Sequence, residues 1–147
     1  MKWVNHQAVT GVLAYAVSDD LLFTIGAVYG AIIPDKIEGR RKILTHRGIS
    51  HYPLLYIVLF LGLLQYFNID NVQSAILSEN QPLRMVFALI FGALCHIAED
   101  ALCGKVPTIT PKIKCGVRLF KVGTFQEYII VIFLIILIYF MKYCYYS

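Results

Sequence analysis

Apolar residues gather in three long runs along the chain, which cover Tyr52–Phe67, Leu83–Cys103 and Tyr128–Met141. A helix that spans a membrane needs about 20 mostly apolar residues. The last run reads YIIVIFLIILIYFM and contains no charged residue, so it is the clearest of the three. The pattern predicts about three transmembrane helices, and Pro53 lies in the first turn of the first one, where proline is tolerated.

Two shorter apolar runs, Ala8–Val17 and Leu21–Ile33, precede these and flank the sequence Ser-Asp-Asp at 18–20. Neither run is long enough to span a bilayer comfortably, and two aspartates at mid-bilayer would be costly. Aspartate is a good helix N-cap. We therefore expect a helical hairpin, or a pair of thin spans, that turns at residues 18–20. Such a hairpin returns His6 and Asp35 to the same end.

The composition favours a membrane protein. Of the 147 residues, 59% are hydrophobic and 15% are charged, with a mean hydropathy of +0.68. Soluble domains have roughly 45–50% apolar and about 25% charged residues. These values exclude a disordered chain, a collagen-like chain and a basic nucleic-acid-binding domain, despite the net charge of +4. We expect an all-α, polytopic membrane protein with a single domain over residues 1–147.

Cationic residues are distributed unevenly over the expected topology. In that topology, residues 1–7, 34–51 and 104–127 lie on one face of the membrane, and they contain eleven of the thirteen lysines and arginines. The positive-inside rule makes this face cytoplasmic. Two interpretations stay open: the cations only set the topology, or some of them also bind an anionic substrate.

All four histidines and five of the nine acids lie on or just under the same face. His96 and Asp100 are four residues apart on a helix, so their side chains point the same way. His96 precedes Gly104 by eight residues, which places it about 12 Å into the membrane, and ionisable groups at such depth mark functional sites. Imidazole and carboxylate are the usual ligands of zinc and similar ions. The candidate metal ligands are His6, Asp35, His46, His51, His96 and Asp100.

The cysteines fit a reduced, membranous setting. No two of them form a CxxC pair, and they are interpreted mostly as packing residues. They are Cys95, Cys103, Cys115 and Cys144.

The polar motifs form an ordered series that resembles the YdjM family of bacterial inner-membrane proteins, described as metal-dependent hydrolases. The series comprises His6, Ile33–Glu38, Thr45–His51, Gly92–Asp100 and Val106–Pro111, and it covers essentially the whole chain. Family members carry an early histidine, a Leu-Pro-Asp turn with an acid, an HRGxTHS segment and a GxxxHxxxD helix. More distantly, the order of ligands is similar to that of zinc-dependent phospholipase C and P1-type nucleases.

The resemblance implies a membrane-embedded hydrolase with two or three divalent ions, zinc being the expected metal. A phosphoester is the expected substrate, such as a phospholipid or a lipid phosphate. Asp35 would bridge two ions or, with Glu38, accept the proton of the attacking water. Arg47 and Arg118 would hold phosphate oxygens, which guanidinium groups do well. The expected location is the bacterial inner membrane, with the active site facing the cytoplasm.

A non-enzymatic protein is the alternative. In that case a structural metal ties the helix ends together, and the basic loops bind a cytoplasmic protein. The family resemblance extends to proteins described as binding the SOS repressor LexA. Coordination separates the two classes, because a structural site is closed and a catalytic site keeps an open position. A small transporter is disfavoured, since the ionisable residues gather at one face and do not line a path across the bilayer.

Overall fold

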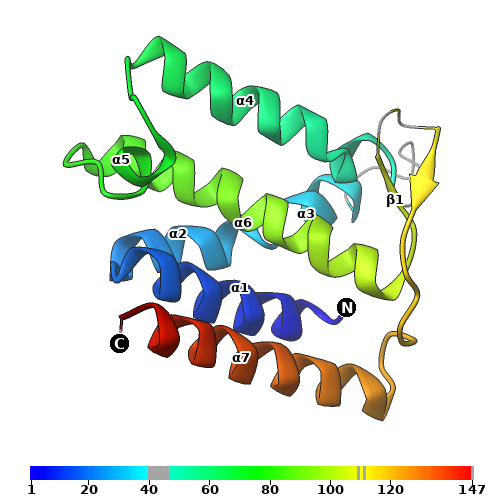
Figure 1. Ribbon diagram of the computed structural model, residues 1–147. Coiled ribbons are helices and arrows are strands. Elements are labelled where there is room, and N and C mark those ends of the chain that lie inside the picture. The colour runs from blue at the N-terminus through cyan, green and yellow to red at the C-terminus, as the bar shows by residue number, and fades with distance from the viewer. Residues whose placement is uncertain (40–46, 109, 111, 147) are drawn as a thin grey trace.

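The computed structural model describes residues 1–39, 47–108, 110 and 112–146, and the chain folds into a helical bundle (Figure 1). The all-α prediction is confirmed. The helices are α1 (Trp3–Ser18), α2 (Leu21–Gly30), α3 (Ile33–Gly39), the 3-10 helix η1 (Ile49–His51), α4 (Pro53–Tyr66), α5 (Val72–Ile76), α6 (Gln81–Cys103) and α7 (Phe125–Tyr146). A small antiparallel pair, β1 (Val106–Pro107) and β2 (Lys114–Cys115), lies between α6 and α7.

Helix α6 lies at the centre of the bundle and contacts α1, α2, α4 and α5. Its closest neighbour is α2, because glycines remove side chains from the contact. A Cβ atom added to Gly92 would lie 1.9 Å from the carbonyl oxygen of Ala27, and one added to Gly30 would lie 2.2 Å from that of Leu89. Small residues of this kind let helix backbones approach closely. Helix α7 packs on the outer side of α1 (Figure 1).

The N-terminal hairpin turns at the predicted place. Helix α1 ends at Ser18, Asp19 has left-handed backbone angles (φ 48°), and α2 begins at Leu21. Asp20 is the N-cap of α2, and its Oδ1 accepts a hydrogen bond of 2.6 Å from the backbone nitrogen of Phe23. The aspartates that interrupt the apolar pattern therefore act as the turn between two antiparallel helices.

Polar contacts fix the two ends of the bundle. At one end, Glu127 of α7 accepts hydrogen bonds of 2.6 Å from the backbone nitrogen of Lys2 and from Nδ2 of Asn5. At the other end, Lys142 of α7 forms an ion pair with Asp19. Helix α1 thus runs parallel to α7 and is attached to it near both ends (Figure 1). Asp20 also pairs at 2.9 Å with Arg84, near the start of α6.

Two helices, α6 and α7, are long and apolar enough to cross a membrane. By length they extend about 34 Å and 33 Å, at about 1.5 Å per residue. The third predicted span is not confirmed. Its apolar run forms α4, which has 14 residues and a length of about 21 Å. The helix ends at Tyr66, and Asn68 then takes a left-handed backbone conformation with φ 52°.

The structure adds short elements within or beside segments that were expected to be loops. Helix α5 forms where the side chain of Asn71 accepts a hydrogen bond of 2.8 Å from the backbone nitrogen of Ser74. Helix α3 begins at Ile33, with Pro34 in its first turn, a position that suits proline. The strands pair Val106 with Cys115. These elements arise from local capping and pairing, which the apolar pattern does not report.

Candidate metal centre

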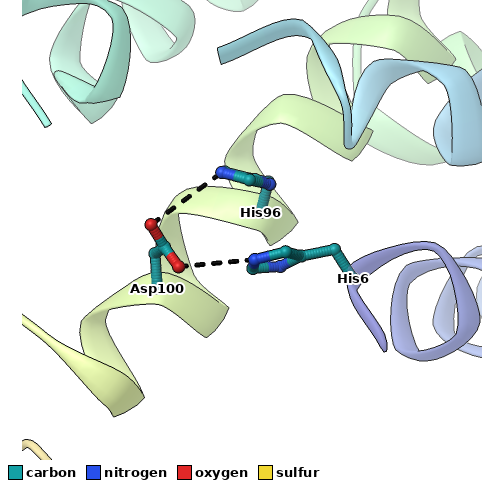
Figure 2. A group of neighbouring side chains, drawn as sticks. All are labelled: His6, His96 and Asp100. Carbon is teal, nitrogen blue, oxygen red and sulfur yellow. Dashed lines mark ion pairs between the residues drawn. The ribbon is translucent and has the colours of Figure 1, made fainter. Parts of the chain in front are cut away.

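Four elements bring histidine and aspartate side chains together at the end of the bundle where α1 begins and α6 ends. Helix α1 supplies His6, α3 supplies Asp35 and η1 supplies His51. Helix α6 supplies His96 and Asp100, which project from the same side of the helix toward His6 (Figure 2). These five residues therefore lie together, as predicted from the order of the motifs along the chain.

His6, His96 and Asp100 form a first group, in which one ligand atom of each lies within 4.8 Å of the others. The Asp100 carboxylate directs one oxygen to each histidine (Figure 2). Its Oδ1 is 3.3 Å from His6 Nε2, and its Oδ2 is 3.9 Å from His96 Nε2. All three residues are buried. Because the two oxygens face different imidazoles, this carboxylate lies between two positions for a cation.

Asp35, His51 and His96 form a second group. The Nε2 atoms of the two histidines are 3.3 Å apart, and Asp35 Oδ1 lies 3.3 Å from that of His51 and 3.5 Å from that of His96. The ligand atoms of a tetrahedral ion with bonds of about 2.0–2.1 Å are separated by about 3.3 Å. Asp100 Oδ2 lies beside this group, 3.6 Å from His51 Nε2. The spacing suits a zinc-sized ion, and His96 belongs to both groups.

Glu99 orients His6. Its Oε2 lies 2.6 Å from His6 Nδ1, and its Oε1 accepts a hydrogen bond of 3.1 Å from the hydroxyl of Thr10. When Glu99 is ionised, its carboxylate accepts a hydrogen bond from Nδ1–H of His6, and Nε2 of the ring faces Asp100. Metal-binding histidines usually donate their other ring N–H to a carboxylate in this way. This contact connects α6 to α1.

His51 is held in a comparable manner. Its Nδ1 lies 3.1 Å from the hydroxyl oxygen of Ser50 and 3.4 Å from Oε2 of Glu38. The other oxygen of Glu38 accepts a hydrogen bond of 2.6 Å from the backbone nitrogen of Arg47. The hydroxyl of Tyr56 donates to the carbonyl oxygen of Ser50 at 3.0 Å. The short helix η1 therefore presents His51 with Nε2 directed toward the second group.

Two cationic groups lie against Asp100. The ammonium nitrogen of Met1 is 2.8 Å from Oδ1, and Arg47 Nε is 2.9 Å from Oδ2. Burial disfavours the charged form of this ammonium, but the hydrogen bond and the attraction to Asp100 outweigh burial and raise its pKa. A buried, ionised carboxylate is stable only when nearby cations or hydrogen bonds compensate for the loss of hydration. A metal ion at Asp100 would take the place of one of these cations.

Asp35 lies on the solvent side of the centre, with a side chain that is 20% exposed, whereas His51 and His96 are at most 1% exposed. Its Oδ2 accepts a hydrogen bond of 2.7 Å from the indole nitrogen of Trp3. Burial opposes ionisation of Asp35, but hydrogen bonds from His51 and His96 outweigh it and hold the pKa of this carboxyl well below its usual range. The ionised carboxylate of Asp35 is therefore the most solvent-exposed member of the second group.

The remaining predicted residues are placed as follows. Glu38 and Arg47 lie within the cluster and contact its candidate ligands. His46 lies outside the described residues. Arg118 lies in an exposed stretch with left-handed backbone angles (φ 58°). Among the described residues, no hydrogen bond or ion pair joins Arg118 to the two groups, so its position gives no support to the expected phosphate-binding role.

Sequence reasoning missed several side chains at the centre, among them Thr10 and Cys103. Thr10 is four residues after His6, and Cys103 is three residues after Asp100, so helical spacing places each beside a candidate ligand. The spacing was therefore a usable signal. Because the cysteines form no CxxC pair and the chain is membranous, the sequence favours a packing role for Cys103.

Comparisons of the chain with protein-family models, curated proteins and solved structures found no match. The function proposed below rests on the geometry of the two groups and on the order of the motifs along the chain.

Proposed function

We propose that this protein is a membrane-embedded, metal-dependent hydrolase that acts on a phosphoester, with zinc as the metal. The observation that supports the proposal is the pair of His/Asp groups that share His96. Buried imidazoles with their nitrogens directed at carboxylates are costly unless a cation or a proton lies between them. Four separate elements supply these residues, which is typical of a functional site and unusual for a packing contact.

The chain's own residues divide the work. His51, His96 and Asp35 hold one ion, and His6 with Asp100 faces a second position. A bound divalent ion lowers the pKa of its water toward about 7 and so supplies a nucleophile at neutral pH. Water can reach the ion beside Asp35, because Asp35 is the most exposed member of its group. Arg47, 14% exposed, adds a positive charge beside the centre that can pair with a phosphate oxygen.

Several features support a location in a bacterial inner membrane. Helices α6 and α7 have the required length, and most of the large apolar side chains of α7 are exposed. Exposed apolar surface of this extent indicates contact with lipid or protein. The His/Asp groups lie at the end of the bundle where α1 begins and α6 ends, the same end as Lys2, Lys36 and Lys105, and the positive-inside rule makes this end cytoplasmic. A lipid-linked phosphoester suits a site at the end of membrane helices.

The non-enzymatic alternative is favoured by one observation. Both oxygens of Asp100 contact protein cations, the Met1 ammonium and Arg47, so a metal ion held there would be enclosed by protein groups. In this alternative the metal is structural, and the exposed basic segment around Lys112 and Lys121 binds a cytoplasmic protein. The order of motifs is shared by both candidates, and only the enzyme requires an open coordination position.

The test is phosphate release by the full-length protein in detergent. Wild-type protein with zinc should release phosphate from phosphatidate or another phosphoester, and a chelator should abolish the activity. Asp35→Asn should lower the rate by at least about 100-fold, the upper end of the loss caused by residues that only support a ligand. Asp70→Asn is the matched control, because Asp70 is exposed at the other end of the bundle. A protein that binds zinc stoichiometrically but hydrolyses no phosphoester would contradict the enzyme and support the structural metal.

A further inference from the structure

We propose that Cys103 is a ligand of the cation position formed by His6 and Asp100, which makes this position a sulfur-containing metal site. The inference deepens the proposed metal centre and rests on the binding of metal there, but it does not depend on hydrolysis. It divides the centre into two chemically different positions. The Asp35–His51–His96 group offers nitrogen and oxygen alone, and the His6–Asp100 position adds a thiolate.

Helical spacing places the thiol at the centre. His96, Asp100 and Cys103 occupy positions i, i+4 and i+7 of α6, which lie along one face of a helix. Cys103 Sγ lies 3.5 Å from Asp100 Oδ1. That oxygen faces His6, whereas Oδ2 of the same carboxylate faces His96 (Figure 2). The sulfur thus adjoins the His6 side of the carboxylate.

The second observation comes from His6 itself. Its side chain is 1% exposed, and Nε2 has no hydrogen-bond partner of good geometry among the described residues. Its Nδ1 contacts Glu99 Oε2, and its Nε2 faces Asp100 Oδ1 at 3.3 Å. A buried ring nitrogen that faces a carboxylate oxygen at this distance needs a proton or a metal ion between the two atoms. The histidine is therefore set for a cation at the oxygen that Cys103 adjoins.

A cation already occupies this place. The ammonium nitrogen of Met1 lies 2.8 Å from Asp100 Oδ1 and 3.2 Å from Cys103 Sγ. Zinc bonds measure about 2.0–2.2 Å to oxygen and about 2.3 Å to sulfur. A zinc ion in the position of the ammonium would need the two ligand atoms to move inward by less than about 1 Å. The carboxylate and the thiol are thus arranged around a positive charge.

The chemistry of sulfur sets the metal preference. Binding removes the thiol proton, which passes to solvent as the metal–sulfur bond forms. Arg47 Nη2, 3.4 Å from Sγ, provides a positive charge next to the resulting thiolate. Thiolate ligands favour zinc, cadmium and cobalt over magnesium and manganese. The His6–Asp100 position should therefore select soft and borderline ions more strongly than the nitrogen and oxygen group.

The experiment is a titration of the metal-free, full-length protein in detergent with Co²⁺, followed by absorption spectroscopy. Wild-type protein should develop a sulfur-to-cobalt charge-transfer band in the near ultraviolet. Cys103→Ser should lose this band and bind Cd²⁺ at least about 10-fold more weakly, and His6→Ala should also lose the band. Cys95→Ser is the matched control and should keep it, because Cys95 is on the same helix one residue before His96 and has no place in the proposed ligand set.

The outcomes separate this inference from the proposed hydrolase. A charge-transfer band in wild-type protein that hydrolyses no phosphoester would support the sulfur ligand and contradict the enzyme. Cobalt binding without the band, or a band that persists in both Cys103→Ser and Cys103→Ala, would overturn the inference and leave the hydrolase standing. A folded protein that binds no Co²⁺ and no zinc would contradict both.

Discussion

Oε2 of Glu99 lies 2.6 Å from Nδ1 of His6, although the two residues are 93 positions apart in the sequence. The contact joins the first helix to the central one and fixes which nitrogen of His6 faces the metal centre. Glu99 therefore acts on the centre through His6, whereas its neighbour Asp100 faces the cation positions directly. Adjacent acids on one helix thus have different tasks.

This difference predicts a graded set of variants. Asp100→Asn should weaken zinc binding by more than about 10-fold, because it removes the charge shared by both cation positions. Glu99→Gln should cost less than Asp100→Asn, since the amide oxygen can still accept from His6 Nδ1 and the amide nitrogen can donate to Thr10. Glu99→Leu removes the acceptor and should cost about 10–100-fold. Zinc affinities measured by competition with a chelator check the order, and equal losses for Glu99→Gln and Asp100→Asn would contradict it.

His96 belongs to both groups, which makes it the most sensitive histidine for metal content. We expect His96→Ala to remove most of the metal found by elemental analysis of purified protein. His6→Ala and His51→Ala should each keep part of it, because each affects one group only. Dialysis against a chelator should reduce the wild type to the level of His96→Ala. Full retention of metal by His96→Ala would show that the metal is bound elsewhere.

The close contact of α2 and α6 predicts opposite effects for two glycines. Gly92→Ala should lower the free energy of unfolding by at least about 1–3 kcal/mol, the usual cost of overpacking, because the new Cβ would lie 1.9 Å from the carbonyl oxygen of Ala27. Gly62→Ala in α4 should be neutral or stabilising by up to about 1 kcal/mol, since alanine is the better helix former and no atom lies within 4 Å of its added Cβ. Thermal unfolding in detergent compares the two variants.

The proposed orientation can be measured with native cysteines. Cys115 lies in β2, at the end of the bundle with the metal centre, and Cys144 lies near the end of α7; both are exposed. In single-cysteine variants expressed in intact cells, a membrane-impermeant maleimide should label Cys144 and should label Cys115 only after permeabilisation. The reverse pattern would place the metal centre on the outer side and contradict a cytoplasmic active site.

The sequence contained enough information to predict the long helices, the turn at Asp20 and the set of converging residues. Apolar runs report what a helix buries or exposes, and ionisable residues within such runs stand out because they are costly. The contact of Thr10 with Glu99 could not be predicted, because it depends on the rotation of α1 against α6. The same holds for Arg47, whose position beside Asp100 depends on its own left-handed backbone conformation (φ 52°).

The attachment of α1 to α7 has a consequence for biosynthesis. His6 lies on α1. The start of this helix is held by a hydrogen bond from the backbone nitrogen of Lys2 to Glu127, two residues that are 125 positions apart in the sequence. Contacts between such distant residues form slowly, because a long stretch of chain must first be brought together. While α7 is still inside the ribosome, α1 carries His6 but lacks the helix that packs on its outer side. The helix that carries His6 therefore reaches its final packing only after α7 has been made, although every proposed ligand precedes α7 in the sequence.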